Sequence, residues 1–262
     1  MLPEREQLTS DFFSCLENAV NFFILRHGES EGNAGKIMQG RKEYSLSEAG
    51  RFQAASRGRA LQAALGSGKS LLFSSPMGRA LETAQIIATQ IISAKISADQ
   101  LTAGKTAAQG ASFPEPVCLD DLTEMSLGIW TGKTWEEVKN DEPALWSAFM
   151  ARSWDAIPGA ESSADLYKRS LRLWAVLRDA AIEYRAENVI TVTHGGLIQW
   201  ILKSTLQCRA WFPLFPISNC GLFKLRVQPR PEEKSAYMCW EEINSPIPDF
   251  DSDIFGFSSK KQ

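Results

Sequence analysis

The sequence lacks an apolar segment long enough to cross a membrane. Its 262 residues contain no run approaching about 18 consecutive apolar residues. Residues 1–7 carry charges of both signs and lack the apolar core of a secretion signal. Hydrophobic residues make up 44% and charged residues 23% of the chain, which is typical of a globular protein. We therefore expect a globular protein with no membrane partner.

The chain also lacks an excess of charge of either sign. It has 28 Lys and Arg residues and 31 Asp and Glu residues, which give a net charge of −3 at pH 7. Proteins that bind nucleic acid usually present a basic surface, and this composition does not favour one. We therefore expect no nucleic-acid partner.

Cysteine is sparse and has no pattern. The five cysteines lie at positions 15, 118, 208, 220 and 239, and no two of them form a Cys-x-x-Cys pair. An odd number without metal-ligand spacing argues against a disulfide framework and against a zinc site. A reducing compartment, the cytoplasm, is therefore the expected location.

Histidine is rare in this chain, and the positions of the two that are present, His27 and His194, are informative. Each follows an apolar run rich in β-formers, and each precedes a glycine, Gly28 or Gly195. With glycine at about 7% of residues, two such pairs arise by chance in roughly 0.5% of cases. We therefore interpret the two histidines as a pair.

Strands and helices are predicted to alternate along the chain. Short continuous apolar runs predict buried strands, and the amphipathic stretches between them predict helices. The predicted strands cover 20–26, 70–74, 116–119, 188–193, 220–227 and 235–241. The predicted helices cover about 45–65, 76–92, 134–152 (one or two helices), 161–184 and 195–204, and a short one is expected within 8–18.

This alternation is typical of an α/β fold with a largely parallel sheet. In such sheets ligands bind beyond the carboxyl ends of the strands, where His27 and His194 both lie. The two can therefore meet although 167 positions separate them. We expect one domain over 20–245, a polar extension over 1–19, a surface loop over about 94–114 and a loose tail over 246–262. Four aromatic residues are expected to face inward: Trp135, Trp146, Phe149 and Trp154.

Arginines near the two histidines point to an anion site. Arg26 precedes His27, and Arg79 follows a predicted strand at its turn into a helix. Guanidinium groups bind phosphate oxygens in a bidentate way. They also lower the pKa of a nearby imidazole, and a neutral imidazole can act as a nucleophile. The glycines after the histidines are expected to leave room for a ligand and to expose N–H groups.

Five short motifs follow one another between about residues 20 and 245. They are Leu25-Arg-His-Gly-Glu-Ser-x-x-Asn33, Ser75-Pro-x-x-Arg-Ala-x-x-Thr-Ala84, Leu122-x-Glu-x-x-x-Gly-x-Trp-x-Gly132, Pro158-Gly-Ala-Glu-Ser162 and Thr193-His-Gly-Gly196. This ordered set resembles the histidine phosphatase superfamily, in the branch that contains phosphoglycerate mutases and fructose-2,6-bisphosphatase. The resemblance implies a three-layer α/β/α fold with a helical lid inserted at about 94–165.

The resemblance also implies a phosphohistidine mechanism without a metal or other cofactor. His27 would attack the phosphorus of a small phosphorylated substrate. Arg26, Arg79 and His194 would hold the phosphoryl oxygens. Glu124 would protonate the leaving oxygen and then activate water.

Further residues are expected to contact the substrate. Asn33 and the N–H of Gly195 would donate to the phosphate, and Ser30, Gln39 and Trp130 would line the pocket. The other branch of the superfamily carries its acid directly after the second histidine, where this chain has Gly195, so Glu124 is the expected acid. An alternative is that Asp120, Asp121 and Glu124 form a solvated acidic turn or bind a hard cation.

The motifs favour a phosphatase of the small type. The opening motif reads Glu-Ser-Glu-Gly-Asn at 29–33 and lacks the tryptophan usual in cofactor-dependent mutases. One alternative is a cofactor-dependent phosphoglycerate mutase, and another is a phosphoprotein phosphatase or protein-binding module on the same fold. The sequence leaves the natural substrate and the oligomeric state open.

Overall fold

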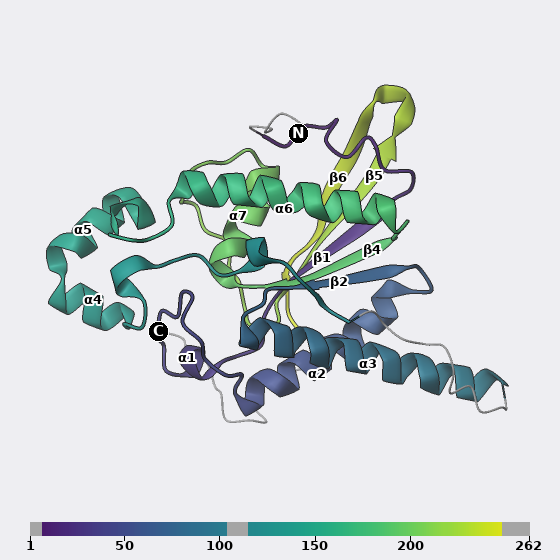
Figure 1. The fold of residues 1–262 in the computed structure, drawn as a ribbon, viewed down its shortest axis with the longest axis horizontal. Coiled ribbons are helices and arrows are strands. Elements are labelled where there is room, and N and C mark those ends of the chain that lie inside the picture. The colour runs from purple at the N-terminus through teal and green to yellow at the C-terminus, as the bar shows by residue number, and fades with distance from the viewer. Residues whose placement is uncertain (1–6, 104–114, 248–262) are drawn as a thin grey trace.

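The computed structural model describes residues 7–103 and 115–247, which form an α/β fold on one mixed sheet (Figure 1). The six strands lie in the order β3-β2-β4-β1-β5-β6. The first four are parallel, and the hairpin β5-β6 adds antiparallel beside β1. The predicted, mostly parallel sheet is confirmed. Its strands are β1 (Val20–Arg26), β2 (Ser70–Ser74), β3 (Val117–Cys118), β4 (Asn188–Thr193), β5 (Leu222–Arg230) and β6 (Ser235–Ser245).

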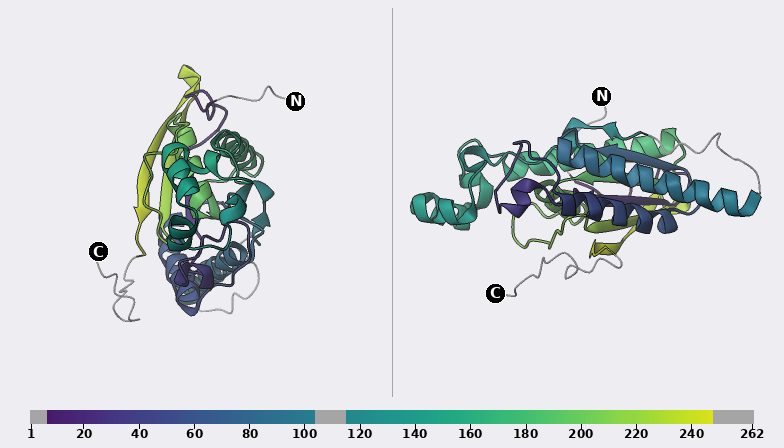
Figure 2. Two further views of the ribbon diagram at one scale, coloured as in Figure 1. Left: turned by 90° about the vertical axis from the view of Figure 1, so that its left-hand side faces the viewer. Right: turned by 90° about the horizontal axis from the view of Figure 1, so that it is seen from below.

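Helices cover both faces of the sheet, so the fold has three layers (Figures 1 and 2). Helices α2 (Glu48–Leu65) and α3 (Gly78–Ala103) cover one face, and α6 (Ser163–Glu183) and α7 (Gly195–Thr205) cover the other. Side chains of β1 alternate between the two cores, because successive residues of a strand point to opposite faces. Phe22 and Ile24 belong to the core with α6 and α7, whereas Phe23 and Leu25 belong to the core with α2 and α3. The middle of β1, residues 22–25, is therefore apolar on both faces of the sheet.

Helix α3 is longer than the sequence analysis predicts. The predicted helix ends near residue 92, but α3 continues to Ala103. Residues 93–103 contain no glycine or proline, and Gly104 is the first residue after them that disfavours a helix. The rest of the predicted loop, 104–114, lies outside the described residues. No helix in the described part of the chain, α3 included, is long and apolar enough to span a membrane.

The predicted polar extension at the N-terminus is wrong for residues 8–16. Leu8, Phe12, Phe13 and Leu16 are buried in the main core, and the segment forms turns rather than the expected helix. The Phe13 ring lies 5.6 Å from the ring of Phe22 and packs edge-on against a tryptophan of α6. The segment therefore belongs to the domain, because its apolar side chains cover the core between β1 and α6. Residues 1–6 lie outside the described residues.

Two short helices project beyond the carboxyl ends of the parallel strands, on the side where α1 (Glu31–Ala34) follows β1 (Figures 1 and 2). They are α4 (Trp135–Asp141) and α5 (Pro143–Arg152), and the turn η3 (Ser153–Ala156) follows them. An aromatic cluster joins them, with ring centroids 5.1 to 6.5 Å apart. Its members are Trp130, Trp135, Trp146, Phe149 and Trp154. The expected inward position of Trp135 is only partly correct, since this side chain packs on the cluster yet is 45% exposed.

The N-terminal segment is predicted to stabilise the fold. Phe13→Ala should lower the free energy of unfolding by about 3–5 kcal/mol, because it leaves a cavity between β1 and α6. Phe52→Ala is the matched control, since Phe52 is 42% exposed on α2. It should cost less than about 1 kcal/mol. Urea unfolding measures both, and equal effects of the two substitutions would show that residues 8–16 do not pack in the core.

Candidate active site

The register of the two central strands brings the two histidines together. Arg26 at the end of β1 pairs with Thr193 at the end of β4, so the next residue of each strand is a histidine. The N–H of His27 donates to the carbonyl of Thr193 over 2.9 Å. The ring centroids of His27 and His194 are 5.1 Å apart, and both side chains are buried. The predicted meeting of the two imidazoles is confirmed.

The contacts of His27 define its tautomer. Its Nδ1 lies 2.6 Å from the carbonyl oxygen of Gly28. A carbonyl oxygen only accepts, so Nδ1 carries the proton and Nε2 keeps its lone pair. Arg79 Nε donates to this Nε2 over 3.3 Å. The Nε2 lone pair of His27 therefore accepts from a guanidinium group in the structure.

Arg79 is fixed by main-chain carbonyls. It is buried, and its Nη1 and Nη2 donate to the carbonyls of Lys42 (3.0 Å) and Gly40 (2.8 Å). Carbonyl acceptors orient the guanidinium without cancelling its charge. Arg79 therefore presents a positive charge beside the His27 ring.

His194 and Arg26 have buried nitrogens suited to an anion. His194 Nε2 lies 2.8 Å from the hydroxyl of Ser75, which follows β2. Among the described residues, His194 Nδ1 and Arg26 Nε are buried without a hydrogen-bond partner in the protein. Buried polar atoms are normally paired, so two such atoms beside His27 indicate a place for ligand oxygens. Arg26 Nη1 is held by the carbonyl of Ile217 at 2.9 Å.

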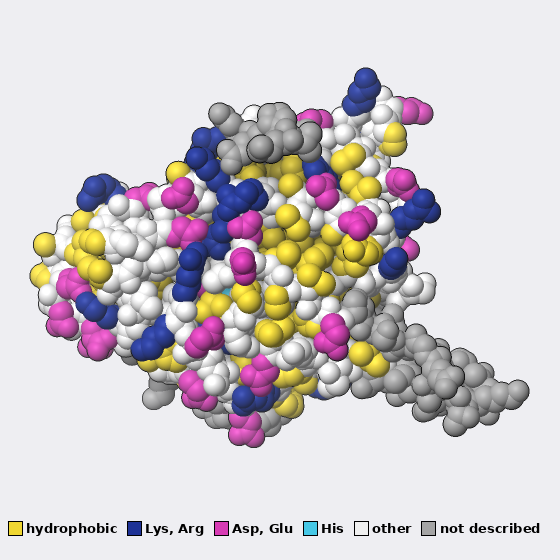
Figure 3. Space-filling model, viewed as in Figure 1, with side chains coloured by type: hydrophobic (Ala, Val, Ile, Leu, Met, Phe, Trp, Pro, Cys, Tyr) yellow, Lys and Arg dark blue, Asp and Glu magenta, His cyan; other side chains and the backbone are white. Residues whose placement is uncertain are grey.

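Burial and positive charge keep both imidazoles neutral. Burial lowers the pKa of His27 well below its usual value, and the charges of Arg26 and Arg79 lower it further. Burial likewise lowers the pKa of His194, with smaller contributions from His27 and the arginines. Figure 3 shows only a trace of histidine colour on the face it displays. Both rings are therefore neutral at pH 7, as the arginines beside them predict.

The Glu124 carboxylate lies at the N-terminus of α7. Its two oxygens accept from the N–H groups of Gly196 and Leu197, both at 3.2 Å, and Oε1 also accepts from the N–H of Met125 at 2.8 Å. A helix N-terminus stabilises a negative charge. A β-carbon at Gly196 would lie 2.6 Å from Oε1, so only glycine leaves room for the carboxylate. The Glu124 carboxylate therefore binds the main chain two and three residues after His194.

The alternative of a cation site at the acidic turn finds no support in the geometry. Within residues 7–103 and 115–247, no three Asp, Glu, Cys or His side chains are close enough together to hold a metal ion. Asp121 instead forms an ion pair with Arg172 at 3.0 Å. The turn η1 (Asp120–Leu122) therefore does not form a cluster with Glu124.

Ser30, Asn33 and Gln39 are bonded to one another beside His27. Ser30 caps α1, and its hydroxyl oxygen lies 2.9 Å from both the Asn33 and the Gln39 amide oxygens, so its single proton is donated to one of them at a time. Asn219 Nδ2 donates to Asn33 Oδ1 and to the carbonyl of His27, both at 3.2 Å. The Asn33 contacts use its amide oxygen rather than its NH2 group. A contact of these three residues with substrate stays a prediction.

Trp130 and Gly28 have other surroundings than the pocket that the sequence suggests for them. Trp130 is fully buried in the aromatic cluster, and its indole N–H donates to Glu142. The prediction that it lines the pocket is wrong, because the apolar ring is more stable among the other rings of α4 and α5. Gly28 is required by α2 rather than by a ligand, since a β-carbon there would lie 2.4 Å from the carbonyl of Gly50. Gly195 has an N–H without an intrahelical acceptor, because it begins α7.

Four residues that shape the site have no role predicted from the sequence. Ser75 and Asn219 contact the histidines as described above, and Glu161 and Arg169 support the Glu124 segment. The burial of Arg169 could have been predicted from the sequence, because it lies on the apolar face of α6 between Leu166 and Leu173. A charged residue on such a face needs a buried partner. Asn219 lies in the loop before β5 and had no such signal.

This arrangement defines an α/β protein with two buried histidines and a buried arginine, Arg79, at the carboxyl ends of its strands. Two overlapping segments of the chain, 22–103 and 91–237, match the model of the histidine phosphatase superfamily (branch 1). The chain therefore belongs to this superfamily, and the resemblance found in the sequence is confirmed.

Several of the named relatives are phosphatases. A metal-independent phosphoserine phosphatase of Arabidopsis thaliana is 31% identical over 208 residues, which cover 78% of this chain and 76% of the relative. A glucosyl-3-phosphoglycerate phosphatase of Mycolicibacterium vanbaalenii is 33% identical over 188 residues, or 70% and 72% of the two chains. A structure of a mycobacterial glucosyl-3-phosphoglycerate phosphatase with VO3 matches with a TM-score of 0.64 at 25% identity, covering 86% of this chain and 99% of that one. The chain is thus an enzyme of the histidine phosphatase class, as the sequence predicts.

The buried imidazoles are predicted to make stability depend on pH. An unfolded histidine has a pKa of about 6.5, and both folded values lie well below it. Below about pH 6.5 the unfolded chain binds protons that the folded chain does not, so the free energy of unfolding falls as pH falls. The slope reaches about 1.4 kcal/mol per pH unit for each histidine.

Urea unfolding between about pH 7 and pH 5 measures this slope. The chain has only two histidines, so the assignment is direct. His194→Asn should remove about half of the slope, because asparagine does not titrate. A wild-type stability that is constant over this range would contradict burial of neutral imidazoles.

Proposed function

We propose that the protein is a metal-independent phosphomonoesterase that hydrolyses a small phosphorylated metabolite through a phosphohistidine. The observation that carries the proposal is the unprotonated Nε2 of His27, which accepts a hydrogen bond from the Arg79 guanidinium, with the ring of His194 at 5.1 Å. An uncharged nucleophile surrounded by fixed cations suits attack on a phosphate dianion.

In the first step, His27 Nε2 attacks the phosphorus and the ester P–O bond breaks. Arg26, Arg79 and His194 bind the non-bridging oxygens, and Asn33 and the Gly195 N–H add donors. These groups stabilise the negative charge that the transition state spreads over the oxygens. Glu124 gives its proton to the leaving oxygen, so the product leaves as a neutral alcohol.

In the second step, water hydrolyses the phosphohistidine. The Glu124 carboxylate takes a proton from water, and the water oxygen attacks the phosphorus as the N–P bond breaks. Inorganic phosphate leaves, His27 regains its lone pair and Glu124 is protonated again. The same carboxyl group thus serves as acid in the first step and as base in the second.

The positive charge for phosphate binding comes from Arg26 and Arg79, so this mechanism requires no metal ion. One relative named above is called metal-independent, which supports this part of the proposal. Phosphoserine and glucosyl-3-phosphoglycerate, from the names of the two relatives, are the first substrates to test. All five cysteines are free thiols, and the cytoplasmic location stays a prediction.

The wild-type protein is predicted to hydrolyse p-nitrophenyl phosphate and a small metabolite ester in the presence of EDTA. His27→Asn should lower kcat/KM by about a thousandfold or more, because it removes the nucleophile and leaves a side chain of similar size. Release of inorganic phosphate measures the activity, and urea unfolding shows whether the variant folds.

Thr89→Ser is the control, because Thr89 is a partly exposed residue of α3 outside the site. It should keep the full activity. Activity lost on chelation, or retained in His27→Asn, would contradict the proposal. Fast interconversion of 2- and 3-phosphoglycerate with slow hydrolysis would instead identify a mutase.

A further inference from the structure

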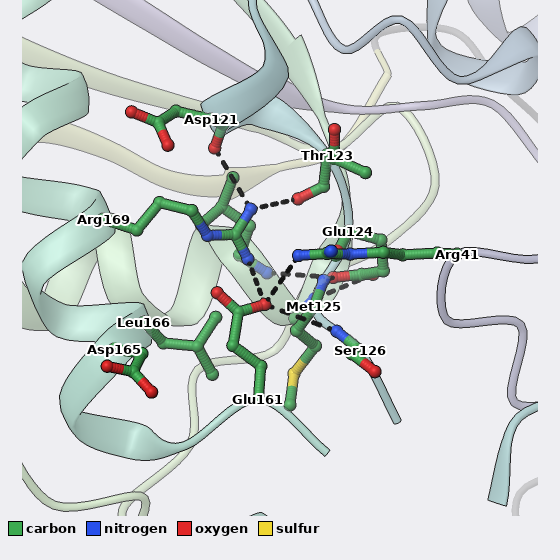
Figure 4. Close-up of polar contacts among 12 residues, drawn as sticks. Arg41, Asp121, Thr123, Glu124, Met125, Ser126, Glu161, Asp165, Leu166 and Arg169 are labelled. Carbon is green, nitrogen blue, oxygen red and sulfur yellow. Dashed lines mark hydrogen bonds and ion pairs between the residues drawn. The ribbon is translucent and has the colours of Figure 1, made fainter. Parts of the chain in front are cut away.

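Glu161, Arg169 and Arg41 form an ionic network outside the phosphate site (Figure 4). The network lies beside residues 123–127, which we call the Glu124 segment. Glu161 Oε2 accepts from Arg169 Nη2 at 2.8 Å and from Arg41 Nη2 at 3.0 Å. The Glu161 and Arg169 side chains are only 14% and 6% exposed, whereas Arg41 is 51% exposed. A single carboxylate therefore holds two guanidinium groups together.

The same two guanidinium groups bind the main chain on both sides of the Glu124 Cα. Arg169 Nη1 donates to the carbonyls of Thr123 (2.5 Å) and Asp121 (3.2 Å). Arg41 Nε donates to the carbonyl of Glu124 itself at 2.9 Å. Each guanidinium group thus binds Glu161 through one nitrogen and the main chain of the Glu124 segment through another, as Figure 4 shows.

Glu161 also binds this segment directly. Its N–H donates to the carbonyl of Ser126 at 3.0 Å, and its Oε2 accepts from the N–H of Ser126 at 3.4 Å. Residues 123–127 lie between the short turns η1 and η2 (Gly128–Trp130) and belong to neither. Their geometry therefore depends on contacts from outside the segment more than on regular secondary structure.

The charges explain why a carboxylate is needed at this position. Arg169 lies close enough to Glu124 to interact with its charge. Without Glu161, two unpaired guanidinium groups would lie beside the Glu124 carboxylate and compete with the N–H groups of α7 for its oxygens. Glu161 pairs with them and directs them toward main-chain carbonyls instead.

We propose that Glu161 is a positioning residue for Glu124: through Arg41 and Arg169 it fixes the main chain that places the Glu124 carboxyl group at the N-terminus of α7. This inference rests on the proposed role of Glu124 as proton donor. Glu161 itself touches no reacting atom, so its loss should impair proton transfer while leaving the nucleophile and the phosphate site in place.

The test compares two esters that differ in leaving group. Phenolate is a far more basic leaving group than p-nitrophenolate, so phenyl phosphate needs the proton donor and p-nitrophenyl phosphate needs it much less. Glu161→Gln should lower kcat/KM for phenyl phosphate by about tenfold or more and for p-nitrophenyl phosphate by less than about threefold. Glu124→Gln should show the same pattern more strongly.

Arg41→Gln and Asp121→Asn complete the set. Arg41 is half exposed, so Arg41→Gln keeps the fold and should lower phenyl phosphate hydrolysis selectively even if Glu161→Gln folds poorly. Asp121→Asn is the matched control, because it removes a carboxylate of the neighbouring turn η1, whose side chain forms an ion pair with Arg172. Its ratio of the two activities should stay within about twofold of wild type.

The outcomes separate this inference from the proposed function. Wild-type protein that hydrolyses neither ester, or a Glu124→Gln variant with no leaving-group dependence, would overturn the proposed roles of the site and this inference with them. A selective loss in Glu124→Gln together with equal losses on both esters in Glu161→Gln and Arg41→Gln would overturn the positioning role alone. Selective losses in all three variants, with an unchanged ratio in Asp121→Asn, are the expected result.

Discussion

The hydrogen bond from the His27 N–H to the Thr193 carbonyl fixes the geometry on which the rest of the site depends. It continues the register of β1 and β4 by one residue beyond the strands, so the two imidazoles leave the sheet side by side. The Thr193 hydroxyl donates to the carbonyl of Leu122 at 2.6 Å and so joins the acid-bearing segment to the same strand end. His27, His194 and the segment that carries Glu124 are therefore held at one end of a buried sheet.

The arginines of this edge fall into two groups according to their partners. Arg26 and Arg79 are oriented by main-chain carbonyls, which leave the full positive charge for an anionic ligand. Arg169 is paired with the carboxylate of Glu161, so its charge is largely neutralised within the protein. The partner of a guanidinium thus separates arginines whose charge remains available to a ligand from arginines whose charge is paired within the protein.

The site centre could be predicted from sequence because both histidines follow continuous apolar strands, and parallel strands end at a common edge. The environment of Trp130 could not, since an aromatic residue near a motif is equally compatible with a pocket and with a cluster of rings. The packing of Phe13 was also hidden, because charged neighbours made its segment resemble an extension. Contacts such as that of Asn219 with His27 join distant loops and have no local pattern.

Chemical trapping of the phosphoenzyme tests the central claim most directly. Glu124→Gln protein should accumulate the intermediate on p-nitrophenyl phosphate, because it lacks the base that activates water. After denaturation in alkali, where phosphohistidine survives, mass spectrometry of peptides and phosphorus NMR locate the phosphate. The account predicts one phosphoryl group on Nε2 of His27. Phosphate on His194, on Nδ1 of His27 or on no residue would contradict it.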